Sequence, residues 1–390
     1  MSLNPIGLKP GVYWVGAIDW SLRNFHGYTT NRGTTYNAYL IVDEKIALID
    51  TVKAMFADEM FSRIEQVVPL EAVDYLVSNH VEMDHSGGIP AALQRMPKAR
   101  VVTSRPQGLK GLTAHYGARD YLAVQSGESL SLGERTLCFV LTPMLHWPDN
   151  MLTYCPEEGI LFSNDAFGQH IASSGRFDDQ IPPDEVMQEA AKYYANIVMP
   201  FRDQAKGALK AAGSLRCDVV APSHGVVWRT RIPEILQAYS RWSDNDPPAA
   251  AVVVFDSMWH STERMAVEIA DAFAARGVPA KLRDLKACHI SDVVADVLEA
   301  KYLAVGSPTL NNNLLPTVAA FLTYLRGLSP KNRKGFAFGS HGWSGQGAGQ
   351  VEEMLAAAGI EILCESVRQA YVPDAASLAG LRQKVEQLSL

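Results

Sequence analysis

A regular alternation of strand-like and helix-like segments in the last third of the chain most strongly restricts how it can fold. Five short segments read as strands, at 251–255, which is an apolar run rich in β-forming residues, and at 280–284, 302–306, 335–339 and 360–366. Each is followed by a segment with helical spacing, at 263–276, 291–298, 316–325, 347–358 and 376–388. Strands that alternate with helices over about 140 residues are typical of a parallel sheet covered by helices on both faces. We therefore predict a doubly wound α/β domain here.

A polar, turn-prone segment separates this rhythm from the rest of the chain. Residues 243–248, with the sequence SDNDPP, end in two prolines, which cannot continue a helix. We predict a boundary there, with one domain over residues 1–248 and another over 249–390. The first domain mixes expected strands at 11–16, 36–42, 46–50, 72–79, 100–104, 136–142, 160–164 and 218–222 with helices at 56–68, 183–198 and 203–215. This mixture favours a layered α/β or α+β arrangement.

Composition excludes several classes of protein. The formal net charge of −7 argues against a nucleic-acid-binding protein, which needs a basic face. The five cysteines are scattered and form no C-x-x-C pair, so we expect a reducing compartment and neither disulfides nor iron–sulfur centres. No apolar run approaches the roughly 18 residues of a membrane span, and the N-terminus lacks an export signal. We expect a cytoplasmic protein that binds no membrane.

Potential metal ligands are concentrated directly after predicted strands. Four lie within six residues of the strand expected at 72–79, namely His80, Glu82, Asp84 and His85. Three more follow other expected strands, namely His146, Asp165 and His224. If these strands share a sheet, their ends bring the loops side by side. Ionisable groups at this density would repel each other or need costly desolvation unless cations hold them, and their number suits two divalent ions with a bridging carboxylate.

Three polar loops follow strands of the second domain, at the edge where doubly wound sheets bind their ligands. The first loop offers Ser257, Met258, Trp259, Ser261 and Thr262; the second Ser307, Pro308, Thr309, Asn311, Asn312 and Asn313; the third Ser340, Gly342, Trp343, Ser344 and Gly345. Hydroxyls and backbone N–H groups at the helix start after the first loop make an anion cradle without the lysine of a P-loop. Any one such loop is usually only a turn. Three at corresponding strand ends favour FMN.

The spacing of the histidine-rich segment resembles that of the metallo-β-lactamase superfamily, whose hydrolases carry His-x-His-x-Asp-His and bind zinc. Glu82 stands at the position of the second histidine. The extra carboxylate makes the ligand set harder and more anionic, which suits iron that changes oxidation state better than zinc. Together with the second domain, this departure resembles the flavodiiron proteins, or A-type flavoproteins, which include rubredoxin:oxygen oxidoreductases.

The resemblance implies an N-terminal metallo-β-lactamase-like αββα sandwich and a C-terminal flavodoxin-like doubly wound parallel sheet. It also implies two iron ions, with His80, Glu82 and His146 on one, Asp84, His85 and His224 on the other, and Asp165 as the bridge. The position of His85 does not always ligate in the family, and Asp84 could serve there with a water instead.

Further residues match family positions that line the substrate pocket. They are His26 and Tyr194, which could donate protons or hydrogen bonds there. A packing role is the alternative for both. His170, soon after Asp165, is another possible pocket residue.

The resemblance implies an oxidoreductase that reduces dioxygen to water, nitric oxide to nitrous oxide, or both, with FMN as the electron relay. It also implies an external donor such as rubredoxin, and a head-to-tail homodimer, or a dimer of such dimers, in which the flavin of one subunit abuts the irons of the other. Because the sequence stops at Leu390, we expect the minimal two-domain class of the family.

Two other functions are left open by the residues. One is a zinc hydrolase of the metallo-β-lactamase superfamily fused to a flavodoxin domain, against which Glu82 argues. Metal analysis with esterase or lactamase assays separates it from a reductase. The other is a non-catalytic electron carrier whose first domain is only structural, which predicts neither metal nor oxygen consumption.

Overall fold

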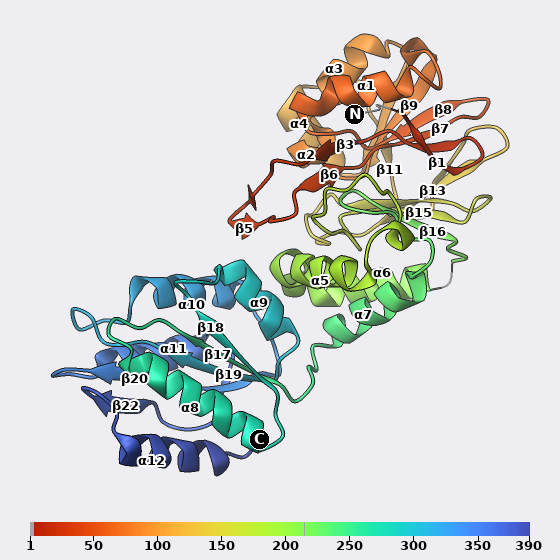
Figure 1. Cartoon of the computed structure of the whole chain (residues 1–390). Coiled ribbons are helices and arrows are strands. Elements are labelled where there is room, and N and C mark those ends of the chain that lie inside the picture. The colour runs from red at the N-terminus through yellow and green to blue at the C-terminus, as the bar shows by residue number, and fades with distance from the viewer. Residues whose placement is uncertain (1–3, 214) are drawn as a thin grey trace. The chain divides into compact units, whose positions relative to one another are not determined.

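The computed structural model describes residues 4–213 and 215–390, which form two compact units (Figure 1). The first unit comprises the chain up to Tyr193 together with Asp203–Ser240, and the second comprises Tyr194–Arg202 and Arg241–Leu390. The short segment Tyr194–Arg202 thus groups with the second unit although it lies within the sequence of the first. The domain boundary expected at residue 248 stays a prediction.

Two sheets form the centre of the first unit. In the described residues one sheet has the order β1 (Ile6–Lys9), β2 (Val12–Trp14), β7 (Tyr39–Ile41), β8 (Ile46–Ile49), β9 (Val73–Ser78), β10 (Arg100–Ser104), β11 (Leu122–Val124). The other has the order β12 (Ser129–Ser131), β13 (Thr136–Leu141), β14 (Met151–Cys155), β15 (Ile160–Asn164), β16 (Val219–Pro222). Two short ribbons, β3 (Ala17–Asp19) with β6 (Thr34–Tyr36) and β4 (Asn24–Phe25) with β5 (Tyr28–Thr29), accompany them.

Alternating side chains of the first sheet enter two different cores. In β9, Leu76 packs in the core on the helix side, whereas its neighbour Val77 packs in the core between the sheets. Helices α1 (Ala57–Ile64), α3 (Ile89–Arg95) and α4 (Gln107–Tyr116) lie outside the first sheet, and α5 (Pro183–Tyr193), α6 (Arg202–Ala212) and α7 (Ile232–Asp244) lie outside the second (Figure 1). The expected αββα sandwich is therefore confirmed.

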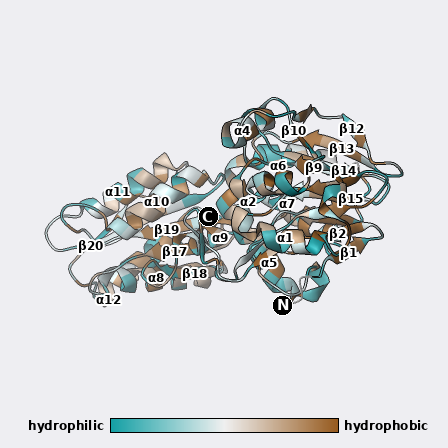
Figure 2. Cartoon of the chain, turned by 90° about the horizontal axis from the view of Figure 1, so that it is seen from above, coloured by the Kyte–Doolittle hydropathy of each residue, from teal (hydrophilic) through white to brown (hydrophobic). Residues whose placement is uncertain are grey.

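The second unit is a parallel sheet with the order β18 (Ala280–Asp284), β17 (Ala251–Phe255), β19 (Tyr302–Gly306), β20 (Lys334–His341), β21 (Glu361–Ile362), and β22 (Val367–Ala370) also pairs with β20. Helices α8 (Ser261–Ala275) and α12 (Ala375–Glu386) cover one face, and α9 (Ile290–Leu298), α10 (Pro316–Leu328) and α11 (Gln346–Ala357) cover the other (Figure 1). The doubly wound sheet is confirmed. Figure 2 shows its central strands coloured as hydrophobic, as strands buried on both faces must be.

The fifth strand differs from the expectation at 360–366. Because β20 is eight residues long, two short strands pair with its successive parts: β21 with Lys334–Gly335 and β22 with Phe338–His341. Among the described residues, the structure contains no helix with the length and apolar character needed to cross a lipid bilayer.

Candidate metal centre and flavin pocket

The candidate metal ligands converge because their strands end at one edge of the sandwich. His80 follows β9 of the first sheet after one residue, whereas Asp165 and His224 follow the parallel strands β15 and β16 of the second. A short helix, α2 (Met83–Ser86), carries Asp84 and His85. The ends of strands from both sheets therefore bring together ligands that are distant in the sequence.

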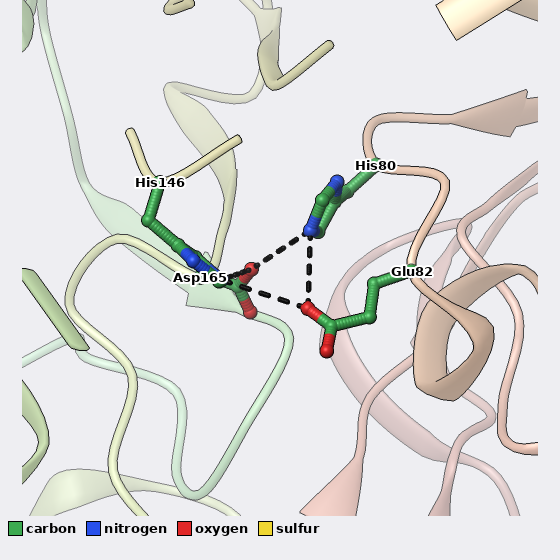
Figure 3. A group of neighbouring side chains, drawn as sticks. All are labelled: His80, Glu82, His146 and Asp165. Carbon is green, nitrogen blue, oxygen red and sulfur yellow. Dashed lines mark hydrogen bonds and ion pairs between the residues drawn. The ribbon is translucent and has the colours of Figure 1, made fainter. Parts of the chain in front are cut away.

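The seven side chains form two adjoining groups. Ligand atoms within each group all lie within 4.8 Å of one another: His80, Glu82, His146 and Asp165 in the first, and Asp84, His85 and His224 in the second. Figure 3 shows the first group, with His80 and Glu82 reaching in from one side and His146 and Asp165 from the other. All seven expected ligands are thus brought together.

Asp165 lies between the groups and presents one oxygen to each. Its Oδ2 is 3.3 Å from Nε2 of His146 and 3.7 Å from Nε2 of His80. Its Oδ1 is 3.1 Å from Nε2 of His85 and 3.7 Å from Nε2 of His224. A carboxylate whose two oxygens face two separate ligand sets has the arrangement of a bridge between two cations.

Burial leaves this cluster short of partners. Five of its members are at most 4% exposed, namely His80, Asp84, His85, Asp165 and His224. Within the described part of the chain, both carboxylate oxygens of Asp84 and of Asp165 and both ring nitrogens of His85 lack a hydrogen bond. Buried carboxylates without hydrogen bonds are costly unless a cation compensates them. These orphaned atoms fit a pair of bound metal ions.

Electrostatic coupling within the cluster shifts the pKa values in opposite directions. Burial opposes protonation of His85, but the charges of Asp84 and Asp165 raise its pKa to about 9. Burial alone would raise the pKa of Asp165, yet the charge of His85 and then the close approach of His146 hold that pKa well below its ordinary value. Protonated imidazoles and ionised carboxylates thus hold each other, and cations that bind here displace the imidazole protons.

His26 lies beside the first group, whereas Tyr194 does not lie where the sequence suggests. Nε2 of His26, whose side chain is 65% exposed, is 2.8 Å from Oε1 of Glu82. The hydroxyl of Tyr194 is instead 3.0 Å from that of Ser243, in the second unit. The tyrosine at the metal cluster is Tyr193, whose ring centroid is 6.1 Å from that of His224. Adjacent residues of a helix point about 100° apart, so the two tyrosines face different surroundings.

His170 and Tyr193 pack against the second ligand group. The ring centroid of His170 is 4.8 Å from that of His224 and 5.1 Å from that of Tyr193. Nδ1 of His170 is 2.7 Å from the hydroxyl of Thr34. Burial, followed by the charge of His224, lowers the pKa of His170 well below its ordinary value, so its imidazole stays neutral. The expected place of His170 beside the cluster is therefore found, whereas Tyr193 was missed.

A buried hydrogen-bond network joins three residues that each directly precede a ligand. Asp50 accepts hydrogen bonds from the backbone N–H of Asn79 at 2.8 Å and from its side-chain amide at 3.0 Å. Asn164 donates to the hydroxyl of Ser223 at 3.0 Å, and more weakly to Asp50 at 3.5 Å. The network fixes the three ligand loops relative to one another. Sequence reasoning missed it because Asn and Ser in loops usually form local turns.

A cavity of about 370 Å³ lies at the carboxyl ends of the parallel strands in the second unit. Eight of the residues expected from the sequence line it: Met258, Trp259, Ser261, Pro308, Thr309, Ser340, Gly342 and Trp343. Four further lining residues were not among the expected ligands: Leu310, His341, Tyr371 and Val372. Tyr371 and Val372 follow β22, so the unrecognised strand also concealed the loop after it.

Other expected flavin-site residues shape the loops or lie beside the cavity. The hydroxyl of Thr262 is 2.9 Å from that of Ser340, and the hydroxyl of Ser307 accepts a hydrogen bond from the backbone of Leu315. The hydroxyl of Ser257 is buried and lacks a partner among the described residues, which fits an anion at the start of α8. The cavity lining does not include Asn311, Asn312, Asn313, Ser344 and Gly345.

Comparison with known proteins supports both units. Residues 34–225 match the family described as ODP family beta lactamase, and residues 253–384 match Flavodoxin. A protein of Moorella thermoacetica named nitric oxide reductase is 47% identical over 367 residues, which cover 93% of this chain and 92% of the relative. The rubredoxin-oxygen oxidoreductase of Megalodesulfovibrio gigas is 41% identical over 386 residues, 97% of this chain and 96% of the relative.

Solved structures extend the likeness to the folds found along the whole length of the chain. The flavodiiron protein from Giardia intestinalis has a TM-score of 0.96 at 35% identity, covering 100% of this chain and 96% of that one. Rubredoxin oxygen:oxidoreductase from Desulfovibrio gigas has a TM-score of 0.95 at 40% identity, covering 99% and 98%. The expected metallo-β-lactamase-like and flavodoxin-like folds are confirmed. With its clustered metal ligands and its flavodoxin domain, this chain belongs to the flavodiiron protein family.

Proposed function

We propose that this protein is an oxidoreductase that reduces dioxygen, nitric oxide or both at the metal cluster, with electrons relayed through a flavin. The observation that carries the proposal is the position of Asp165, whose two oxygens face two sets of nitrogen and oxygen ligands. Relatives of 47% and 41% identity are named nitric oxide reductase and rubredoxin-oxygen oxidoreductase, which supports this reaction class.

We assign two iron ions to the cluster. His80, Glu82 and His146 would hold one, Asp84, His85 and His224 the other, and Asp165 both. Two ions bound there would hold the substrate and supply it with electrons. The donors are imidazoles and carboxylates without a thiolate, a set that suits iron. Nε2 of His85 lies 3.4 Å from Oδ1 of Asp84 and 3.1 Å from Oδ1 of Asp165 without a hydrogen bond, which supports its inclusion as a ligand.

Side chains around the cluster position groups and protons. His26 contacts the oxygen Oε1 of Glu82, leaving Oε2 toward His80 and His146. Burial raises the pKa of Tyr193 well above its ordinary value, so its phenol stays protonated and remains a hydrogen-bond donor. Together these residues can orient one ligand and offer a donor beside the cluster.

We assign FMN to the cavity of the second unit. FMN would accept electrons from a donor and release them singly. The hydroxyl of Ser257 and the start of α8 would hold the phosphate, while the exposed ring of Trp343 and that of Tyr371 line the space for the isoalloxazine. Lys286 donates to the backbone carbonyl of Ser257 at 2.6 Å and steadies this loop.

The electron donor and the assembly are part of the same proposal. Rubredoxin or a comparable carrier would reduce the flavin. Because electron transfer weakens steeply with distance, the flavin must lie close to the metals, and we propose the head-to-tail homodimer, alone or as a dimer of dimers. A cytoplasmic location stays a prediction from the scattered cysteines.

One experiment tests the function. The protein is purified without oxygen, its iron, zinc and FMN are quantified, and after chemical reduction it is mixed separately with dioxygen and with nitric oxide. We expect two iron ions and one FMN per chain, with rapid consumption of at least one gas and formation of water or nitrous oxide. Two zinc ions with ester, amide or thioester hydrolysis would establish the competing hydrolase instead.

A further inference from the structure

The ligand histidines differ in what holds their second ring nitrogen. Nδ1 of His80 is 2.9 Å from a carboxylate oxygen of Asp149. Nδ1 of His224 is 2.7 Å from the backbone carbonyl oxygen of Thr35. Nδ1 of His85 has no hydrogen-bond partner in the described residues. Of these three imidazoles, only that of His80 is supported by a negative charge.

Asp149 is held firmly in the orientation that this contact needs. It is 4% exposed, and the same oxygen that faces His80 accepts a hydrogen bond from the backbone N–H of Val81 at 2.8 Å. Its backbone carbonyl accepts from the hydroxyl of Ser104. An oxygen that accepts from an N–H on one side is an acceptor for His80 as well, so Nδ1 of His80 carries the proton. Nε2 then presents its lone pair to the first ligand group.

We propose that Asp149 is a positioning residue that fixes the orientation and tautomer of His80 and adds a negative charge to one half of the metal centre. The inference rests on the proposed metal centre. A carboxylate that accepts from a ligand imidazole makes that imidazole a stronger donor. Each ligand group has one carboxylate of its own, Glu82 or Asp84, and Asp165 is shared between them. The additional charge of Asp149 therefore makes the site of His80 bind its metal ion more tightly than the other site.

The test measures metal affinity rather than turnover. Metal-free protein is titrated anaerobically with ferrous iron, and the ⁵⁷Fe-loaded protein is examined by Mössbauer spectroscopy. Asp149→Asn keeps the shape of the side chain but removes its charge. We expect one of the two affinities to fall by about 10- to 100-fold and one of two iron signals to change. Asp149→Glu, which restores the charge, should recover part of that affinity. Unchanged affinities, or an equal loss at both sites, would overturn the proposal.

A matched control separates this effect from general damage. Asp178 is fully buried in the same unit and accepts hydrogen bonds from the backbone of Arg229 and Arg231, away from the ligands. Asp178→Asn should lower stability and leave both iron affinities unchanged.

A wild-type measurement covers the case in which Asp149→Asn fails to fold. A chelator should remove the two iron ions in two phases of one ion each, and simultaneous release would contradict the inference. A wild-type chain that binds no iron refutes the proposed function, whereas two bound ions with an unaffected variant refute only the role of Asp149.

Discussion

Replacing Asp50 with alanine should destabilise the first unit even when no metal is bound. Asp50 is 3% exposed and lies close enough to the ligand His85 for their charges to interact. Its two oxygens accept both N–H groups that Asn79 directs at it, at 2.8 Å and 3.0 Å. The carbonyl oxygen of the Asn79 side chain is engaged by Thr153, so the amide cannot turn over without losing that bond.

The structure sets the size of this effect. Asp50→Ala leaves two buried donors of Asn79 without acceptors, and each orphaned donor costs about 1–3 kcal/mol. The expected loss is therefore about 2–6 kcal/mol, a large part of the ~5–15 kcal/mol that stabilises an ordinary domain. Asp50→Asn keeps one acceptor oxygen, so we expect about half that loss. Asp120→Ala removes an exposed carboxylate, 84% accessible, and should change stability by less than ~0.5 kcal/mol.

Urea unfolding of the chelated protein measures these losses. The fluorescence of Trp14 and Trp228, which are 1% and 0% exposed, reports on the first unit. Because two units can unfold separately, each transition is fitted on its own. A loss below about 1 kcal/mol for Asp50→Ala would refute the reasoning that this carboxylate satisfies otherwise orphaned donors.

Three other substitutions or treatments have defined outcomes. Glu82→His removes the carboxylate that distinguishes this ligand set, so reductase turnover should fall at least about tenfold and zinc should replace iron. Gas consumption measures the turnover and metal analysis measures the bound ions. Unchanged turnover would contradict the ligand assignment. Ser257→Ala should weaken FMN binding about 5- to 10-fold in a fluorescence titration, while riboflavin, which lacks the phosphate, should bind as before. An equal loss of affinity for both flavins would show that Ser257 does not bind the phosphate. Burial, and after it the charge of the neighbouring Glu157, raises the pKa of Cys155 to about 11. At pH 8 iodoacetamide should therefore alkylate Cys155 about 100-fold more slowly than a thiol of ordinary pKa. Rapid labelling of the folded protein would contradict the raised pKa, because it would show that the thiolate is present and accessible.

The doubly wound sheet was largely predictable because its signals are local. Strands buried on both faces are continuous apolar runs, as β17 and β19 are. The expected bounds of β17, β18 and β19 are all found, although β18 is a partly exposed strand with the sequence AKLRD. The strand that was not expected has a less apolar sequence. β22 has a half-exposed, mixed sequence, and overlooking it also hid Tyr371 in the flavin cavity. In the first unit, β14 was not expected, although all five of its residues are buried.

Segments that change direction were less predictable. The run expected as one strand at 36–42 divides, since Tyr36 ends β6 while Tyr39 begins β7 in a different sheet. The helix expected over 183–198 is α-helical only to Tyr193, and a π-helical turn continues to Val198. Where the two helices join, Tyr193 packs against His170 and the hydroxyl of Tyr194 contacts that of Ser243. Only packing against the rest of the molecule determines where such a strand or helix ends and which way its side chains point.

Residue order alone identified the seven candidate ligands, because imidazoles and carboxylates at strand ends are a chemical pattern that can be read without coordinates. It could not show that the oxygens of Asp165 face different ligand groups, nor that Asp149 supports His80 from 69 positions further along the chain. Hydrogen bonds and ion pairs act through space over a few ångströms. Which residues become partners therefore depends on how the two sheets of the first unit pack together, and this packing depends on the whole domain.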